Sequence, residues 1–166
     1  MLNMNELKRL IDDDELIRDF INLDKQIQPC GFDLSLREIR AYEGAGAVDF
    51  SNEERVIAET NKISPDADGW WELSPGCYVV IYNETVKIPL DLAAIARPRS
   101  SMLRNAATVE TAVWDPGYEG RSSSLLIVYN QHGLRLRKNA RIVQLVFVET
   151  GKVDKGYDGD YQGERM

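Results

Sequence analysis

Arginine and serine side chains suited to binding phosphate gather in one short stretch of the chain. The sequence "RPRSSMLR", residues 97–104, holds three arginines and two adjacent serines. Guanidinium groups make forked, permanently charged contacts with phosphate oxygens, and serine hydroxyls add short hydrogen-bond donors. One interpretation is a polyphosphate cradle formed by Arg99, Ser100, Ser101 and Arg104. The alternative is that these arginines stand at the end of a strand and face solvent.

An aspartate in a turn is the second feature that suggests chemistry. Asp115 stands directly before a Pro-Gly dipeptide. An aspartate in this position commonly bonds the N–H groups of its own turn, whereas one held rigidly at a cleft orients or deprotonates a water molecule. Tyr118 follows closely, and its ring can pack against a sugar. Glu110 is the second candidate for a reacting carboxylate, and Glu119 is expected to be exposed in the turn.

Length and charge limit the functions that these residues can serve. The 166 residues predict one domain with a sizeable core, and the net charge of −7 argues against binding nucleic acid through a broad basic surface. No apolar stretch resembles a signal peptide or is long enough for a membrane span, so we expect a cytoplasmic protein without a membrane partner. Cys30 and Cys77 are predicted to be reduced thiols, and the single His132 gives little support to a histidine-based triad or metal site.

The elements that must position these residues are mostly strands. Stretches rich in β-branched and aromatic residues recur at short spacing, separated by glycine and proline turns. They cover residues 32–39, 77–88, 122–130, 133–139 and 141–150. This pattern predicts a mainly β protein, an antiparallel sandwich or barrel.

Helical spacing of apolar residues is confined to the N-terminal segment, residues 1–22. One set is Leu7, Leu10 and Ile11, and a second is Leu16, Ile17, Phe20 and Ile21. These sets predict one or two short helices. Residues 43–72 are polar and irregular, and we expect a long excursion there with a hairpin around residues 69–73.

The C-terminal end differs in composition from the rest of the chain. The tail "GKVDKGYDGDYQGERM" is rich in glycine and tyrosine and poor in aliphatic residues. Such a tail is mobile unless something holds it down. We therefore expect one β domain over residues 1–156 and a flexible arm over residues 157–166.

Five motifs occur in an order that resembles one enzyme family. The motifs are Gly31-Phe32-Asp33-Leu34, Pro98-Arg99-Ser100-Ser101, Asp115 with Tyr118 and Gly120, Arg141-Ile142-Val143-Gln144-Leu145, and the tail "YDGDYQGE" at 157–164. Together they resemble the trimeric deoxyuridine triphosphate nucleotidohydrolases (dUTPases) and the related dCTP deaminases, with archaeal-type dUTPases closest. Five motifs in the same order make this resemblance specific, although each motif alone is weak.

The resemblance implies a fold, an assembly and a reaction. The fold is a distorted jelly-roll or β-barrel, and the assembly is a homotrimer with active sites between subunits. The reaction is hydrolysis of dUTP to dUMP and pyrophosphate, with Asp115 orienting the water that attacks the α-phosphorus. Mg²⁺ is held mainly by the triphosphate rather than by the protein. Asp33 supports the site or makes an outer-sphere contact to the metal.

The resemblance also assigns substrate contacts. Arg99, Ser100 and Arg104 contact phosphate oxygens, with Ser101 and Gln144 near them. Thr111 meets the base, and Tyr118 lies under the deoxyribose, where it leaves no room for a 2′-hydroxyl. The C-terminal arm closes over the active site, and its contacts are Tyr161 and Gln162.

Other activities on the same fold stay open at this point. In the family's deaminases a glutamate on the strand after the third motif shuttles protons. Counting back from Tyr129, this position falls at Ile127, and no acid lies between Arg121 and Asn130. A deaminase without its shuttle loses orders of magnitude in rate, so the sequence favours dUTP hydrolysis over a dCTP deaminase or a bifunctional enzyme. A non-catalytic nucleotide-sensing protein and a purely structural jelly-roll module are the remaining alternatives.

Overall fold

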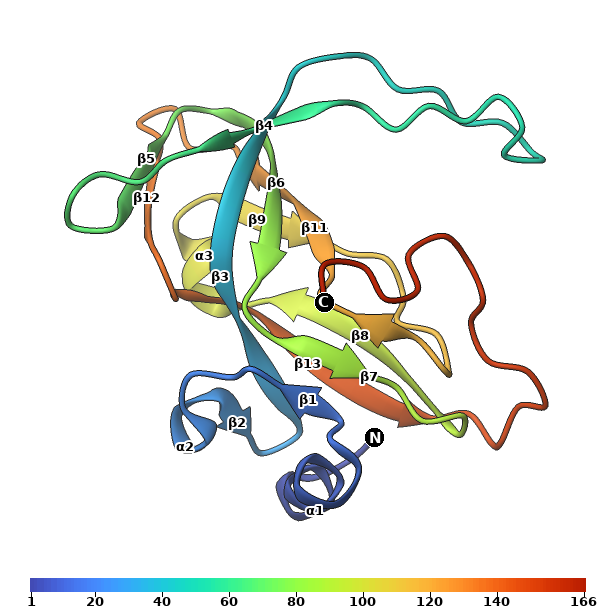
Figure 1. The fold of residues 1–166 in the computed structure, drawn as a ribbon. Coiled ribbons are helices and arrows are strands. Elements are labelled where there is room, and N and C mark those ends of the chain that lie inside the picture. The colour runs from blue at the N-terminus through green and yellow to red at the C-terminus, as the bar shows by residue number, and fades with distance from the viewer.

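One long strand organises the sheet on which the molecule is built (Figure 1). The computed structural model describes residues 1–166. Strand β3 (Gly31–Tyr42) pairs through its first half with β13 (Arg141–Glu149) and through its second half with β6 (Gly76–Tyr82). Residues 31–36 are buried without alternation, because this part of β3 has protein on both faces. The strand therefore joins two parts of the sheet through the interior.

The main sheet curls into a nearly closed barrel. Its strand order is β8-β13-β3-β6-β11-β9, where β8 is Leu92–Pro98, β9 is Ala107–Glu110 and β11 is Ser123–Val128. Ala94 of β8 and Trp114, just after β9, exchange two backbone hydrogen bonds of 2.9 Å and so connect the two edge regions. The prediction of a mainly β barrel is confirmed.

Shorter strands extend the barrel at its ends. One three-stranded sheet has the order β1-β7-β10, and a separate pair is β12-β5. Two more strands, β2 and β4, flank β3. The bounds are β1 Ile17–Arg18, β2 Ile27–Gln28, β4 Thr60–Ile63, β5 Trp70–Leu73, β7 Thr85–Lys87, β10 Glu119–Gly120 and β12 Leu134–Arg137. The hairpin predicted around residues 69–73 is wrong, because β5 pairs with the distant β12.

Residues 43–59 lie between β3 and β4 and extend from the barrel as a long loop (Figure 1). The loop is held internally by the bridge between Ala47 and Val56 and by the Glu43 N–H donating to the Glu59 carbonyl. The predicted polar excursion over residues 43–72 is therefore partly correct: it begins as irregular chain and ends in two short strands.

The structure has three helices, α1 (Met4–Asp14), α2 (Leu23–Gln26) and α3 (Ser100–Arg104). Asn3 and Glu6 form a capping box at the start of α1, and Glu15 ends the helix in the left-handed conformation. The second predicted helix, over Leu16–Ile21, is wrong: Leu16 and Ile17 are buried, but the chain turns and forms β1 there. None of the three helices combines the length and apolar character needed to cross a membrane.

The hydrophobic core is one cluster of 31 buried residues that runs from Leu2 to Phe147, with none from the long loop between β3 and β4. Strand β13 shows how the sequence pattern builds it, because Leu145 and Phe147 are buried and Val146 between them is half-exposed. A cluster of this size stabilises the fold through removal of apolar surface from water.

A buried carboxylate ties the end of the barrel together. Glu84 has no exposed surface and lies in the turn between β6 and β7. Its carboxylate accepts hydrogen bonds from the Ser35 N–H (2.8 Å), the Ser35 hydroxyl (2.5 Å) and the Gln26 amide (2.6 Å). Burial raises the pKa of Glu84, and these donors oppose the rise. The turn is therefore fixed to both β3 and α2.

This arrangement makes stability depend on pH through Glu84. The folded state holds the Glu84 proton more tightly than the unfolded chain, whose glutamate pKa is about 4.3. The unfolding free energy of the wild type, relative to Glu84→Gln, should be highest below that pH. It should fall as pH rises through the raised folded pKa, by at most about 1.4 kcal/mol per pH unit. Urea unfolding between pH 4 and 8 measures this difference. A pH-independent difference, equal to that of the exposed control Glu149→Gln, would contradict the assignment.

Candidate active site

The turn that carries Asp115 has a defined geometry. The Tyr118 N–H donates to the Asp115 carbonyl at 3.1 Å, and Gly117 has a φ of 84°. Proline at the second position and glycine with positive φ at the third are the residues that a type II turn requires. A Cβ on Gly117 would also lie 2.8 Å from the Gly156 Cα atom. The turn therefore leaves Asp115 exposed and buries Tyr118, which is 6% exposed.

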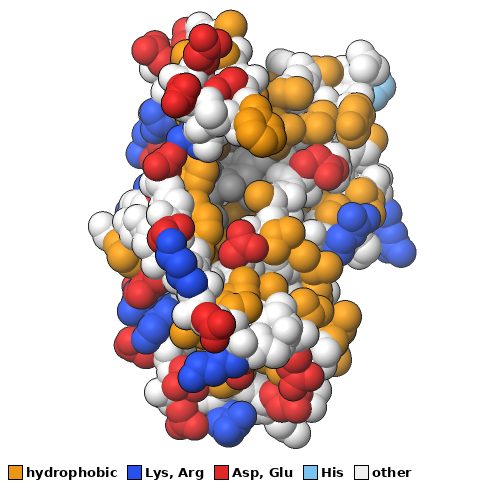
Figure 2. Space-filling model, turned by 90° about the vertical axis from the view of Figure 1, so that its right-hand side faces the viewer, with side chains coloured by type: hydrophobic (Ala, Val, Ile, Leu, Met, Phe, Trp, Pro, Cys, Tyr) orange, Lys and Arg blue, Asp and Glu red, His pale blue; other side chains and the backbone are white.

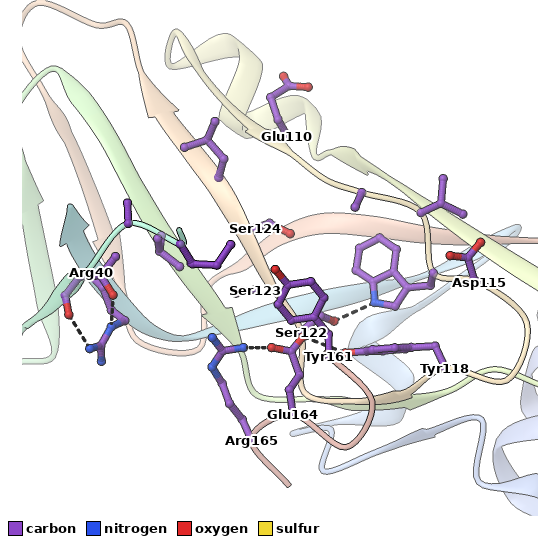
Figure 3. A pocket seen from close by; sticks show the side chains of 18 of the residues that line it. Arg40, Glu110, Asp115, Tyr118, Ser122, Ser123, Ser124, Tyr161, Glu164 and Arg165 are labelled. Atoms are coloured by element: carbon purple, nitrogen blue, oxygen red, sulfur yellow. Dashed lines mark hydrogen bonds and ion pairs between the residues drawn. The ribbon is translucent and has the colours of Figure 1, made fainter. Parts of the chain in front are cut away.

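A cavity of about 550 Å³ lies beside this turn. Part of its wall is one cross-strand row on the sheet, Arg40, Val79, Leu125 and Glu110. The face shown in Figure 2 is hollowed between hydrophobic side chains, with acidic side chains near the recess. In the close view of Figure 3, Asp115 and Arg40 lie toward opposite ends of the cavity. Its mixed lining suits a ligand with a flat apolar part and a polar end.

Several residues singled out in the sequence meet at this cavity. Asp115, Tyr118 and Tyr161 all line it, as does the second-ranked carboxylate Glu110. Thr111 is half-buried and lies between lining residues without lining the cavity itself. These residues come from the end of β9, from the chain that follows it and from the C-terminal arm.

The predicted phosphate cradle lies elsewhere on the same chain. Arg99, Ser100, Ser101, Arg104 and Gln144 line no part of the cavity. Both serines and Arg104 are exposed on α3, a helix that the sequence did not predict. Arg99 is five residues beyond Ala94, which at about 3.3 Å per residue places it roughly 16 Å along β8 from the bridge to Trp114, the residue before Asp115. One chain therefore carries the two halves of the candidate site apart from each other.

A buried aspartate holds the cradle in place. The Asp33 carboxylate is 1% exposed and forms ion pairs with Arg99 (3.0 Å) and Arg141 (3.1 Å). Burial raises the pKa of Asp33, and the two guanidinium charges oppose the rise. Gly31 permits the close packing of β3 against β13, because a Cβ there would lie 2.6 Å from the Leu145 carbonyl oxygen. Of the two roles expected for Asp33, support of the site fits this geometry, since its carboxylate is already bound by arginines.

The C-terminal arm packs against the Asp115 turn of its own chain. The Gly163 N–H donates to the Glu119 carbonyl (2.8 Å), and the Arg121 N–H donates to the Glu164 carbonyl (2.9 Å). The Gln162 side chain donates to the Gly117 carbonyl (3.0 Å) and accepts from the Glu119 N–H (3.0 Å). In this structure Tyr161 therefore lines the cavity and Gln162 is bonded to the turn beside it.

Some residues of the site were not found from the sequence. Tyr157 and Glu164 contact Tyr118, and the Trp114 indole donates to the Ser122 hydroxyl (2.7 Å) at the cavity wall. The signal for Tyr157 and Glu164 in the sequence is weak, because the tail has no strand or helix pattern that indicates which way a side chain faces. Only the packing of the tail shows which of its side chains face the turn.

The acidic residues of the structure do not form a metal site of their own. No group of three or more aspartate, glutamate, histidine or cysteine side chains is placed to hold a metal ion. Mg²⁺ usually retains water ligands and binds through one or two carboxylates together with substrate phosphates. Asp115 supplies one exposed carboxylate, so it fits only as one ligand of an ion that substrate phosphates also bind.

Comparison with known proteins identifies the family. The family model described as dCTP deaminase-like matches residues 1–150. The chain belongs to the dCTP deaminase-like family. A relative from Methanosarcina mazei, named probable deoxyuridine 5′-triphosphate nucleotidohydrolase, is 51% identical over 166 residues, covering 99% of this chain and 97% of the relative. The deoxyuridine 5′-triphosphate nucleotidohydrolase of Methanocaldococcus jannaschii is 44% identical over 146 residues, covering 87% and 92%. The resemblance expected from the five motifs is confirmed.

A solved structure supports the fold of this dCTP deaminase-like chain. The 2′-deoxycytidine 5′-triphosphate deaminase from Agrobacterium tumefaciens matches with a TM-score of 0.69 at 20% identity. The match covers 90% of this chain and 48% of the deaminase, so this chain spans about half its length. At this identity the likeness shows a shared barrel architecture.

In this dCTP deaminase-like chain, strand β11 lacks the acidic residue that a deaminase is expected to carry there. Ile127 is half-buried and lies opposite Thr108 of β9 and Cys77 of β6. On β9, however, Glu110 lies directly opposite Leu125 and lines the cavity. Glu110 is therefore the carboxylate that a deamination reaction at this cavity would use.

Removal of the buried Asp33 charge should weaken the fold around the cradle. Asp33→Asn leaves Arg99 and Arg141 without their counter-charge, and hydrogen bonds to charged groups contribute about 1.5–3 kcal/mol each. We expect the unfolding free energy to fall by no more than about 1–3 kcal/mol. The loss is limited because removal of the charge also removes the burial cost that raises the Asp33 pKa, and because both arginines are partly exposed and regain solvent. Urea unfolding measures the loss. The exposed control Asp12→Asn should lose less than about 0.5 kcal/mol; equal losses would show that the two ion pairs do not matter.

Proposed function

We propose that this protein is a dUTP diphosphatase, which hydrolyses dUTP to dUMP and pyrophosphate. The observation that carries the proposal is Asp115, held by a type II turn at a cavity that Tyr118 and Tyr161 also line. The names of the relatives from Methanosarcina mazei and Methanocaldococcus jannaschii support dUTP as the substrate. The separate basic cradle supports recognition of a triphosphate.

Asp115 acts on the attacking water. Its exposed carboxylate accepts a hydrogen bond from a water molecule and aligns the oxygen with the α-phosphorus. The water oxygen forms a bond to the α-phosphorus, and a proton of the water passes to the Asp115 carboxylate. The bond from the α-phosphorus to the oxygen that bridges to the β-phosphorus breaks, and pyrophosphate leaves. Because the turn fixes Asp115 before substrate binds, little reorganisation is needed. Mg²⁺, held mainly by triphosphate oxygens, supplies charge neutralisation for the leaving group.

Tyr118 selects the sugar in this proposal. Its ring is nearly buried at the cavity wall beside the Asp115 turn. A deoxyribose packs flat on such a ring. The 2′-hydroxyl of a ribose would clash with the ring and would lose its hydrogen bonds to water. The stretch around Thr111, whose neighbours Glu110 and Ala112 line the cavity, meets the base in this proposal. Tyr161 and Gln162 cover the nucleotide as the arm closes and limits access of water.

The complete site forms between subunits of a homotrimer. The Asp115 cavity is not lined by the cradle residues of its own chain, because Arg99 follows β8 and Ser100, Ser101 and Arg104 lie on α3. A neighbouring copy that places Arg99, Ser100 and Arg104 at the cavity mouth completes the triphosphate site, with Ser101 and Gln144 beside them. Each trimer then has three sites, each built from two chains.

Asp115→Asn should remove hydrolysis while leaving nucleotide binding. The amide keeps the shape of the side chain but loses the charge that polarises the water, so we expect kcat for dUTP to fall by about 10²–10⁴-fold. Pyrophosphate release with Mg²⁺ measures the rate, and titration calorimetry measures binding. Retained activity in this variant, with loss in Glu110→Gln, would transfer the role to Glu110.

The same assay decides between hydrolysis and deamination. The wild-type protein is given dUTP, dCTP or dTTP, and pyrophosphate and ammonia are measured separately. Release of pyrophosphate from dUTP alone supports the proposal. Ammonia from dCTP would favour a deaminase that uses Glu110, and binding of dUTP without turnover would favour a nucleotide-sensing protein.

Mixing two inactive variants should restore activity if sites form between subunits. Asp115→Asn disables the cavity half and Arg104→Ala weakens the cradle half, so a mixed trimer regains sites with both halves native. Random exchange of equal amounts should restore about a quarter of the wild-type sites. The matched control mixes Asp115→Asn with Tyr118→Ala, which lie on the same half, and it should show no activity above the mean of the two variants assayed separately. Recovery in neither mixture, with exchange verified by mass-tagged subunits, would argue that each site belongs to one chain.

A further inference from the structure

We propose that Glu164 is a positioning residue that fixes the Tyr118 ring and thereby sets discrimination between deoxyribose and ribose. The inference rests on the proposed function, because it assigns the control of sugar selection within that site. It gives the C-terminal arm a role in specificity in addition to covering the nucleotide.

The arm holds Tyr118 at two points. The Tyr118 hydroxyl donates to the Glu164 carboxylate at 3.1 Å, and its ring packs edge-on against Tyr157, with centroids 5.7 Å apart at 72°. Figure 3 shows Tyr118 and Glu164 close together at the cavity. A ring held at its hydroxyl and at its edge has little freedom to tilt. The surface that the ring presents to a sugar is therefore set by the arm.

The contact is a built feature of the turn rather than a chance approach of two side chains. A Cβ on Gly120 would lie 2.7 Å from the Tyr118 hydroxyl and 3.3 Å from the Glu164 Cγ atom. A side chain at Gly120 would therefore push the hydroxyl away from the carboxylate. The missing side chain leaves room for the pair.

Protonation of Tyr118 favours the same contact. Burial raises the pKa of Tyr118, and the neighbouring Glu164 charge adds to the rise, while the Ser122 hydroxyl and Arg165 oppose it. The phenol therefore stays neutral and able to donate across the working pH range. The Glu164 carboxylate is also paired with Arg165, so the carboxylate that accepts from Tyr118 is itself oriented.

Backbone hydrogen bonds deliver Glu164 to this position. Glu164 accepts at its carbonyl from the Arg121 N–H, and the preceding Gly163 N–H donates to Glu119. These bonds run along the segment that links Tyr118 to β11. When the arm is docked, Glu164 reaches Tyr118, and when the arm leaves, the hydroxyl loses its acceptor. Sugar selection is thus coupled to docking of the arm.

A double-mutant cycle tests this coupling. The trimer is assayed with dUTP and UTP as wild type, Glu164→Ala, Tyr118→Phe and the double variant, and the ratio of kcat/KM values is the readout. Loss of a hydrogen bond to a charged acceptor predicts a fall in the dUTP/UTP ratio on the order of tenfold in each single variant. The double variant should fall no further, because both changes break one contact. Gly120→Ala should lower the ratio in the same direction.

Controls separate this role from a general effect of the arm. Asp158→Asn changes an exposed arm residue that pairs with Lys155, and it should leave the ratio unchanged. Glu164→Gln, which still accepts a hydrogen bond, should recover part of the ratio. Equal loss of activity toward dUTP and UTP, or additive losses in the double variant, would overturn the inference.

Absence of dUTP hydrolysis in the wild type would instead count against the proposed function. The ratio of the dUTP and UTP binding constants, measured by calorimetry, would then test the inference. An unchanged ratio in the variants would overturn it.

Discussion

The ion pairs of one buried carboxylate underlie the geometry of the candidate site. Asp33 lies in β3 almost without access to water, and a charge in that position must be paired. Its partners, Arg99 and Arg141, follow β8 and begin β13. The pairing therefore joins the central strand to both neighbours and orients Arg99 at the start of α3. A phosphate-binding group needs such preorganisation, because a free arginine loses conformational entropy each time it binds.

The same strand arrangement separates the two chemical functions. Strand β8 carries the cradle at one end, while the Ala94–Trp114 bridge at the other end sets the place of the Asp115 turn. A stiff strand cannot bring both ends to one ligand within one chain. This constraint supports the proposal of an active site shared between copies. It also explains why the cavity of a single chain contains carboxylates and aromatic rings but no basic group of the phosphate motif.

The C-terminal arm adds a second level of organisation. Its docking relies on backbone bonds, the Gln162 side chain and the contacts of Tyr157 and Glu164 with Tyr118, with little apolar burial. Contacts of this kind are individually weak and exchange readily with water. The proposed function needs an arm that docks and leaves, and contacts of this kind are compatible with it. A segment that alternates between these states can admit substrate, shape the sugar site while docked, and release product.

The sequence by itself determined the barrel class, the helix that became α1, the turn at Asp115 and the family, because these depend on local patterns and on ordered motifs. Tertiary structure alone decided that Leu16 and Ile17 lead into a strand, since their burial is satisfied by neighbouring strands rather than by a helix face. It also decided that residues 100–104 form α3, that Asp33 pairs with arginines, and that Glu164 reaches Tyr118. The two side-chain contacts join residues that are far apart in the sequence, and no local sequence pattern predicts them. Only the packed chain brings these residues together.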